Sequence, residues 1–307
     1  MAPERNDPFT AEGEWLRCAL HAHTTRSDGE LEPDALAAHY GRAGFDMLAI
    51  TDHWKRTEAA ASGRLLVVPS VELNCILPAA RDGHVLGFGI SADADLAALG
   101  AEYADLARTA GFIVEHGGVA YLAHPYWTGA TPGTLELPES VAGIEVWNAG
   151  CELEVGRGLS SVHWDELLET GRHCFGLVTD DSHHPGFDSG HGWTWLRAPE
   201  RSAEAVLAAL AAGTFYGSSG PVLLDVAVDG EEVEVRCSPA RSVTLVSGRT
   251  EGAAVNAGRL GYRYAGEVLS DDERGITHAR LRRPFGAAYA RIEVTDAQGN
   301  RAWTNPL

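Results

Sequence analysis

The sequence is poor in positive charge, and almost all of that charge comes from arginine. Its 307 residues contain 24 Lys and Arg against 43 Asp and Glu, for a formal net charge of -19, and Lys55 is the only lysine. Nucleic-acid affinity comes largely from Lys and Arg side chains that displace counterions from phosphates. We therefore expect no nucleic-acid polymer among the partners of this chain.

Paired cysteines and long apolar runs are also missing. The cysteines number 5 and show no CxxC spacing, which argues against a disulfide framework and against a zinc ribbon. No apolar run approaches the roughly 18 to 20 residues that cross a bilayer, and the polar Met1–Glu14 segment does not resemble a signal peptide. We expect a cytoplasmic protein without a membrane partner.

The patterning of the chain predicts an α/β fold in two parts. Up to about residue 220, short apolar runs alternate with amphipathic ones, such as the helix expected over Asp93–Glu115 and the strand expected over Leu65–Val71. This alternation favours a mostly parallel sheet, closed or nearly closed into a barrel. Beyond it, short strands and turns at Asp229-Gly230 and 297–300 indicate a small antiparallel β-sandwich. We predict domains over 1–220 and 221–307.

Histidines and acids fall where the predicted strands end. His21 and His23 close the first strand, and residues i and i+2 of a strand point to the same face, so both imidazoles can reach one ion. Further potential ligands end strands or lie in the turn after one at Asp28, His53, Glu72, His124, Asp181 and His183, and His84 lies at the start of a strand. Chemistry in barrel enzymes is placed at the carboxyl ends of strands. Mixed imidazole and carboxylate sets suit Zn, Mn or Fe.

Other polar residues have simpler interpretations. A lone histidine at a strand end is more often a capped or solvent-facing side chain than a ligand, so the hypothesis depends on the whole set. His184 points to the opposite strand face from Asp181 and His183, and Asp52 and Asp180 are better interpreted as supports that orient ligands. We interpret the remaining histidines outside the loop after Asp181 as structural; these are His39, His116, His163, His173 and His278.

Taken in order, the ligand motifs resemble those of the polymerase-and-histidinol-phosphatase (PHP) superfamily over about residues 15 to 220. They are Leu20-His21-Ala22-His23, Ser27-Asp28-Gly29, Thr51-Asp52-His53, Val71-Glu72, His84, Ala123-His124-Pro125 and Asp181-Ser182-His183. The resemblance implies a distorted (β/α)7 TIM-like barrel that holds two or three divalent metal ions. The segments 190–195, 216–221 and 302–306 resemble the carbaryl-hydrolase-like branch, which implies a small C-terminal β-domain.

The resemblance also assigns each ligand. One metal would be held by His21, His23, Glu72 and Asp181. Glu72 would bridge to a second metal that His84 and His124 also bind. Asp28, His53 and His183 would hold a third metal.

Such a centre predicts hydrolysis of a small phosphoester by a hydroxide that bridges two metals, because bound cations lower the pKa of water. Glu72 and Asp181 would then serve catalysis as metal ligands. His191 and Asp188 are candidates to protonate the leaving group or hold substrate, and capping of a loop turn is the simpler alternative. Lys55 and Arg56 are candidates to bind an anionic group, with surface solvation as the alternative.

Further possibilities stay open at this point. Asn148, which follows a strand, is a candidate to line the substrate cleft, as are Tyr126 and Trp127, with packing at the barrel rim as an equal alternative for Trp127. The same centre could hydrolyse a carbamate or a carboxylic ester if the pocket were apolar and uncharged. A nonenzymatic metal-binding protein or a nuclease is less favoured, the latter because the chain lacks basic tracts.

Overall fold

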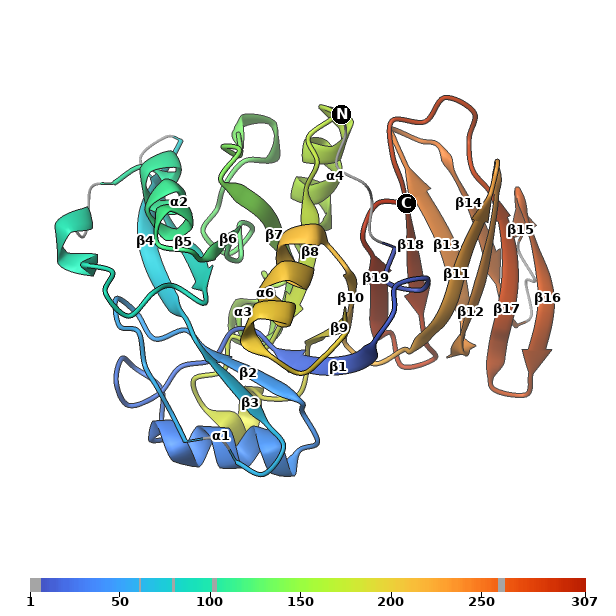
Figure 1. Ribbon diagram of the computed structural model, residues 1–307. Helices are drawn as coiled ribbons and strands as arrows, with labels where there is room; N and C mark the ends of the chain where they lie inside the picture. Colours follow the sequence, from blue (N-terminus) through green and yellow to red (C-terminus); the bar gives the residue numbers. More distant parts are fainter. Residues whose placement is uncertain (1–6, 61, 79–80, 101–103, 259–262) are drawn as a thin grey trace.

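The computed structural model describes residues 7–60, 62–78, 81–100, 104–258 and 263–307, which form a mixed α/β fold (Figure 1). The helices in this part of the chain are α1 (Pro33–Arg42), α2 (Leu106–Glu115), α3 (Ala149–Val155), α4 (Ser161–Glu169), α5 (Pro185–Asp188) and α6 (Ala203–Ala212), with 3-10 helices at Leu96–Leu99 and Pro132–Thr134. None of them has the length and apolar character needed to cross a bilayer.

Two groups of strands surround the predicted ligands. One group belongs to a ten-stranded sheet and comprises β1 (Glu14–Ala19), β2 (Met47–Ile50), β3 (Leu66–Pro69), β9 (Trp193–Ala198) and β10 (Phe215–Ser218). The other is the five-stranded sheet β4 (Val71–Leu77), β5 (Arg81–Phe88), β6 (Val119–Leu122), β7 (Val141–Asn148) and β8 (Phe175–Thr179). β2 and β8 are buried at every residue, as expected of strands that are covered on both faces.

The pairing in these groups is mixed rather than mostly parallel. The parallel pairs are β1–β2, β2–β3, β6–β7 and β7–β8. β5 is antiparallel to both β4 and β6, and β9 is antiparallel to β1. The expected parallel sheet is therefore interrupted at β5, which pairs in the antiparallel direction on both sides, and at β9.

Two isolated bridges join the strand groups where the predicted ligands lie. Ala22, which follows β1, pairs with Ser182, which follows β8. His53, which follows β2, pairs with Glu72 in β4. Segments far apart in the sequence are thus brought side by side at one edge of the fold.

The C-terminal strands form two antiparallel layers, drawn in orange and red in Figure 1. One layer is a four-stranded sheet of β11 (Leu223–Asp229), β12 (Glu232–Ala240), β16 (Gly266–Asp272) and β17 (Gly275–Arg282). The other is the end of the ten-stranded sheet, with β13 (Ser242–Ser247), β14 (Gly252–Asn256), β15 (Arg263–Tyr264), β18 (Ala290–Thr295) and β19 (Arg301–Thr304). Val235 and Leu281 of the first layer share a buried cluster with Leu245 and Ile292 of the second.

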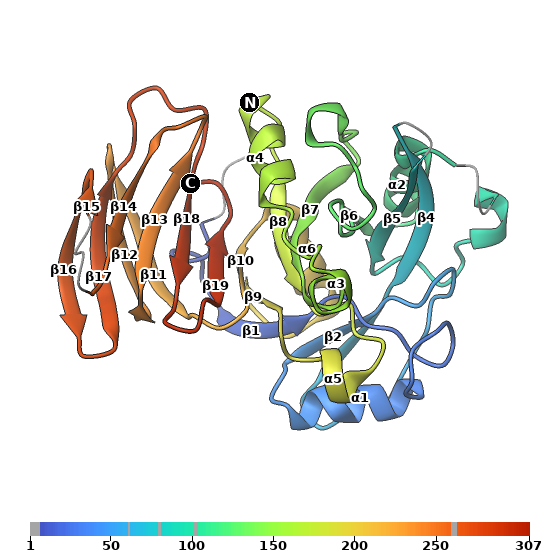
Figure 2. The ribbon, with the colours of Figure 1, turned by 180° about the vertical axis from the view of Figure 1, so that it is seen from behind.

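The C-terminal layers are continuous with the site-bearing strands. β19 pairs with β10, so the ten-stranded sheet runs from β15 to β3 without a break (Figure 2). The predicted turn at Asp229-Gly230 connects β11 to β12, and the turn at 297–300 connects β18 to β19. The domain limits at residue 220 stay a prediction, since the sheet spans them.

Two predicted elements differ from the observed ones. The helix expected over Asp93–Glu115 is interrupted, because Asp105 accepts a hydrogen bond from Arg108 N and so caps the N-terminus of α2; residues 101–103 of that prediction lie outside the described residues. The strand expected over Leu65–Val71 ends at Pro69, where the pairing of β3 with β2 stops. From Val71 on, the chain forms β4, which pairs with β5 instead. Glu72 is consequently inside a second strand rather than at the end of one.

Candidate metal centre

The carboxylate of Glu72 lies at the middle of the predicted ligands, and its two oxygens face different imidazoles. Oε2 is 3.0 Å from His21 Nε2 and 3.1 Å from His23 Nε2. Oε1 is 2.7 Å from His84 Nδ1 and 3.2 Å from His124 Nε2. The side chain is 1% exposed. One buried carboxylate therefore separates two sets of nitrogen donors.

Asp181 closes the first of these sets. Its Oδ1 lies 3.1 Å from His21 Nε2 and 3.3 Å from His23 Nε2. Donor atoms of His21, His23, Glu72 and Asp181 all lie within 4.8 Å of one another. Three nearby residues, Trp54, His124 and Asp181, have φ angles of 57°, 27° and 54°. Non-glycine residues with positive φ cost energy and cluster at functional sites, which fits a backbone shaped around this cluster.

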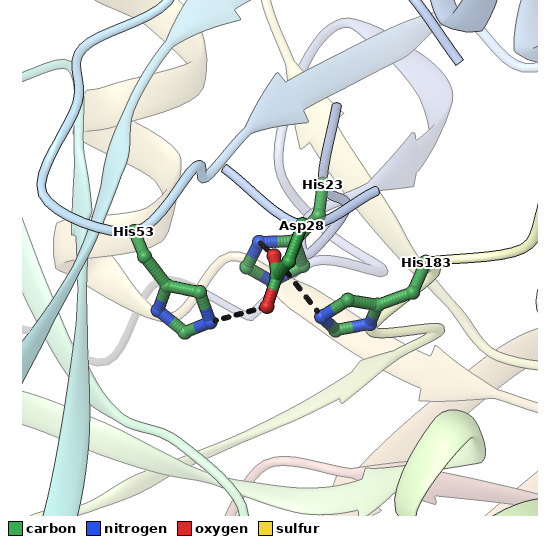
Figure 3. Close-up of side chains that lie close together, drawn as sticks. All are labelled: His23, Asp28, His53 and His183. Atoms are coloured by element: carbon green, nitrogen blue, oxygen red, sulfur yellow. Dashed lines mark ion pairs between the residues drawn. The ribbon is translucent and has the colours of Figure 1, made fainter. Parts of the chain in front are cut away.

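A second group lies toward the solvent and includes Asp28 (Figure 3). Asp28 Oδ1 is 3.5 Å from both His23 Nδ1 and His183 Nε2, and its Oδ2 is 3.5 Å from His53 Nε2. The rings of His23 and His183 stack with centroids 4.2 Å apart. Asp28 is 53% exposed and His53 is 27% exposed, whereas His21 is fully buried. The cluster is thus closed at His21 and open at Asp28.

A third group comprises His53, Glu72 and His84. His84 is in the interior of β5, opposite Asn74 of β4, and not at the start of a strand as the sequence predicts. Asn74 contacts both His84 Nε2 at 3.1 Å and Trp54 Nε1 at 2.7 Å. This antiparallel register directs His84 toward Glu72, two positions before Asn74 on the same strand face.

Glu145 is a functional candidate that the sequence analysis missed. It is fully buried in β7, and its Oε1 accepts a hydrogen bond from His21 Nδ1 at 2.8 Å and one from Thr179 Oγ1 at 2.6 Å. Its Oε2 accepts from the backbone N–H of His124 at 2.9 Å. Because Nδ1 of His21 is engaged, its Nε2 is left to face Glu72. A single acid inside the apolar run Ile144–Trp147 is the signal that could have revealed it.

The two predicted support residues, Asp52 and Asp180, hold the loops that carry ligands. Asp52 accepts hydrogen bonds from Thr24 and Ser27, which fixes the segment before Asp28. Asp180 accepts from the backbone N–H groups of residues 190, 191 and 192 and from the hydroxyl of Tyr40. Both are fully buried and act on loops rather than directly on a ligand ring.

The charges of the cluster shift the pKa values of its own side chains strongly. Burial opposes ionisation of Glu72, but the imidazoles of His21 and His84 outweigh it and hold the pKa of this carboxyl well below its usual range. Burial likewise opposes protonation of His23, but attraction to Asp181 and Glu72 raises the pKa of its imidazole to about 9. The pKa of His21 is also raised, against burial, by Asp181, Glu72 and Glu145. Carboxylates and imidazoles thus compensate one another across the cluster.

The donor set fits divalent cations. His23 Nε2 and Asp181 Oδ1 are buried and 3.3 Å apart, but neither forms a well-directed hydrogen bond within the described part of the chain. A buried polar atom without a directed hydrogen bond costs free energy, and a shared cation would supply the missing interaction. Imidazole nitrogens together with carboxylate oxygens are the ligands of Zn, Mn and Fe sites.

Two predicted substrate contacts, Asn148 and Asp188, have partners within the chain instead. Asn148 is fully buried, and its amide N–H groups donate to Glu145 Oε2 and Asp181 Oδ2 while its oxygen accepts from Cys151 N. Asp188 is 5% exposed and accepts from Ser182 Oγ and from the backbone N–H groups of His183 and His184. Both side chains therefore position ligand segments, because their hydrogen-bonding groups are already used.

His191 does not join the cluster. Its ring contacts the backbone oxygen of Phe187 at 3.1 Å, and its N–H donates to Asp180. It lines a separate cleft with Trp147, Trp193 and other residues of β7, β9 and the turn before β19. Its role in protonating a leaving group or in holding substrate stays a prediction.

The other histidines have local partners. His39 contacts Ser189, His116 contacts the Phe112 carbonyl, and His163 contacts the Ala130 carbonyl. His173 packs against Phe175, His184 faces Glu30, and His278 faces Glu234. These contacts agree with a structural role.

Lys55 and Arg56 line an open cleft of about 650 Å³ together with Arg26, Trp54 and four neighbouring residues. Lys55 Nζ donates to the Arg26 carbonyl, and Arg56 Nε donates to the Ile90 carbonyl at 2.9 Å. Arg26 is two residues from Asp28, and Lys55 is two residues from His53, so this cationic cleft borders the solvent-facing group. Glu58 offsets part of the charge by pairing with Arg56 at 2.7 Å.

The chain is similar in fold to solved structures. It aligns with a two-domain protein from Bacteroides vulgatus ATCC 8482, which contains a predicted PHP-like metal-dependent phosphoesterase, over 100% of both chains, with 16% identity and a TM-score of 0.53. A lesion-specific endonuclease from Pyrococcus furiosus aligns with 64% of this chain and 56% of its own, at 11% identity and a TM-score of 0.45. An amidohydrolase from Chromobacterium violaceum aligns with 57% of this chain and 90% of its own, at 19% identity and a TM-score of 0.40.

No protein-family model and no curated protein is similar enough in sequence to match the chain. The full-length alignment shows that the chain shares the fold of a protein with a PHP-like phosphoesterase.

Proposed function

We propose that the protein is a metal-dependent hydrolase of the PHP type that cleaves a small phosphoester. The observation that carries the proposal is the position of Glu72, whose two oxygens face separate sets of imidazoles within 3.2 Å. A carboxylate in this position is suited to bridge two cations. The fold shared with a protein that contains a PHP-like phosphoesterase supports the same class.

The nine predicted ligands divide between three cation positions. We assign His21, His23, Glu72 and Asp181 to the first, Glu72, His84 and His124 to the second, and Asp28, His53 and His183 to the third. Zn, Mn or Fe would suit these donors. Divalent cations bound here would lower the pKa of water and polarise the ester.

Residues of the chain prepare the centre for this chemistry. Glu145 holds His21 in the tautomer whose Nε2 is free to bind a cation, as outer carboxylates do for metal-binding histidines. Asn148 holds Asp181 and Glu145 at a fixed separation. The hydrogen bonds that fix these groups reduce the reorganisation needed when substrate binds.

The cationic cleft favours a phosphoester over a carbamate. Arg26, Lys55 and Arg56 would attract an anionic group to the solvent-facing side, where Asp28 and His53 are exposed. A neutral carbamate gains nothing from these charges. The strongly acidic chain argues against a nucleic-acid polymer, so we propose a small-molecule substrate.

We also propose that the strands around the centre form the distorted (β/α)7 barrel of the PHP superfamily, supported by the two bridges between the strand groups. The carbaryl-hydrolase-like branch and a cytoplasmic location complete the proposal. For the location, the support is that all five cysteines are free thiols.

The test is to load the protein with Mn²⁺ or Zn²⁺ and to compare turnover of a nitrophenyl phosphate with that of a naphthyl carbamate. We expect phosphate hydrolysis that is lost on chelation and in the Asp181→Asn variant, but kept in Asp225→Asn, an exposed carboxylate on β11. Turnover of the carbamate alone would overturn the choice of a phosphoester. Full metal content without turnover of any ester would overturn the hydrolase itself.

A further inference from the structure

Trp127 is an exposed aromatic side chain beside the second cation position. Its ring centroid lies 5.0 Å from that of His124 and 6.2 Å from that of His84. The residue is 39% exposed, and among the described residues it belongs to none of the buried apolar clusters. Small-molecule sites are lined largely by aromatic and apolar side chains with a few polar groups beside them, and an exposed indole next to this polar cluster is suited to line such a site.

The loop that carries Trp127 is held in one conformation. It leaves β6 through His124, whose φ is 27°, and Pro125. Thr128 N donates to the His124 carbonyl at 3.2 Å, and Ala130 N donates to the Pro125 carbonyl at 3.0 Å. The indole is therefore presented by a compact turn, which keeps the entropy cost of binding small.

Trp127 and the cationic cleft lie by different parts of the ligand cluster. The indole contacts His84 and His124, which face Glu72 Oε1. Lys55 follows His53, which is 3.5 Å from Glu72 Oε2. A substrate whose anionic group binds at the cluster would thus meet the indole of Trp127 on one side and the cationic cleft on the other.

We propose that Trp127 is a specificity-determining residue that packs against a planar leaving group. The substrates would then be phosphoesters whose leaving group is an aromatic alcohol or another flat ring system. This inference rests on the proposed phosphoesterase function. Aromatic pairs are more favourable than the burial of their area alone would give, and an aliphatic leaving group would not make this contact.

Tyr126 supplies a matched control on the same loop. It is 42% exposed, but its ring lies 6.1 Å from His163 and 5.7 Å from the guanidinium of Arg157 rather than against a ligand of the cluster, so the expectation that it lines the substrate cleft is not carried further. Trp127→Leu removes the aromatic ring, Trp127→Phe retains one, and Tyr126→Leu makes the same type of change outside the cluster.

The experiment measures binding of phenylphosphonate and of methylphosphonate to the Mn²⁺-loaded proteins by calorimetry, after the metal content of each variant has been determined. We expect Trp127→Leu to weaken phenylphosphonate binding by about 3- to 10-fold and methylphosphonate binding by less than about 2-fold. Trp127→Phe should largely restore the preference, and Tyr126→Leu should leave it unchanged. KM for phenyl phosphate should rise in Trp127→Leu more than KM for methyl phosphate.

If Trp127→Leu weakens the binding of both phosphonates equally, or of neither, the proposed role of Trp127 is wrong. Phosphoester turnover by the unmodified protein would in that case still support the proposed function. If the unmodified, metal-loaded protein binds neither phosphonate and hydrolyses no phosphoester, the proposed function fails, and the inference about Trp127 fails with it.

Discussion

His21 donates a hydrogen bond from Nδ1 to Glu145 Oε1 across 2.8 Å, between two side chains that are both fully buried. Glu145 makes no ion pair with a second histidine among the described residues and lies behind the ligand cluster rather than inside it. Glu145 therefore orients His21, a predicted metal ligand, and is not itself one of the predicted ligands.

Replacing Glu145 with Gln should weaken metal binding by about 10- to 100-fold, because loss of the outer carboxylate makes a histidine ligand less basic and less well oriented. Titration with a competing chelator measures this change. Glu139→Gln is the matched control, since Glu139 is 96% exposed and contacts Arg172 at 3.8 Å. Unchanged affinity in Glu145→Gln would show that the hydrogen bond to His21 has no role in metal binding.

Metal binding should release protons at neutral pH. Attraction to Asp181 and Glu72, acting against burial, raises the pKa of His23 to about 9, so in the metal-free protein this imidazole is protonated below that pH. A cation binds only the neutral form, and its apparent affinity should therefore increase as pH rises toward about 9. Calorimetry at pH 7 in two buffers with different ionisation enthalpies measures the proton count. Identical heats in the two buffers would contradict the prediction.

The sequence predicts the ligand cluster better than its surroundings. His21 and His23 are two residues apart, and extended geometry predicts their common direction, although in the structure β1 ends at Ala19 and both histidines lie in the segment that follows it, on either side of the bridge at Ala22. Glu72 is brought to them only because the chain changes sheets at Ser70, and this change depends on long-range pairing with β5.

The loops after the strands show why side-chain roles are harder to predict. Asn148 and Asp188 have residue types suited to substrate binding, but burial and backbone partners decide their use, and these are set by tertiary contacts. His191 is turned away because Asp180 binds the backbone of its loop. The interruption of the predicted helix at Asp105 is a local capping signal that the long apolar pattern concealed.

Lys55→Met should raise KM for an anionic phosphoester by about 2- to 5-fold with little change in kcat, because an exposed ion pair contributes no more than about 1 kcal/mol. The difference from the unmodified protein should diminish at high salt, which screens exposed charges. Steady-state kinetics at low and high ionic strength test both points. Arg274→Met is the control, on the distant turn between β16 and β17, and it should match the unmodified protein.

The buried ion pair between α4 and β18 should stabilise the fold without affecting the metal centre. Arg291 is 2% exposed, and its Nε and Nη2 each lie 2.9 Å from an oxygen of Asp165. Asp165→Ala leaves this guanidinium without its bidentate partner and should lower the free energy of unfolding by about 2 kcal/mol, less than for a fully buried pair because Asp165 is 28% exposed.

Urea unfolding measures this loss. Arg301→Ala, which removes the 38% exposed partner of Glu293, should cost less than about 0.5 kcal/mol. Equal stability of the two variants would remove the assigned role of the Arg291–Asp165 pair, and a large loss of metal affinity in Asp165→Ala would show that the pair also shapes the centre.

The position of bound cations tests the central claim most directly. Crystals of the protein grown with Mn²⁺ or Zn²⁺, measured by anomalous scattering at the metal edge, should show ions on both sides of the Glu72 carboxylate, one beside His21, His23 and Asp181 and one beside His84 and His124. In Glu72→Gln crystals, at least one of these peaks should weaken or disappear. Ions bound only at scattered surface carboxylates, or no ion between these side chains, would contradict the account.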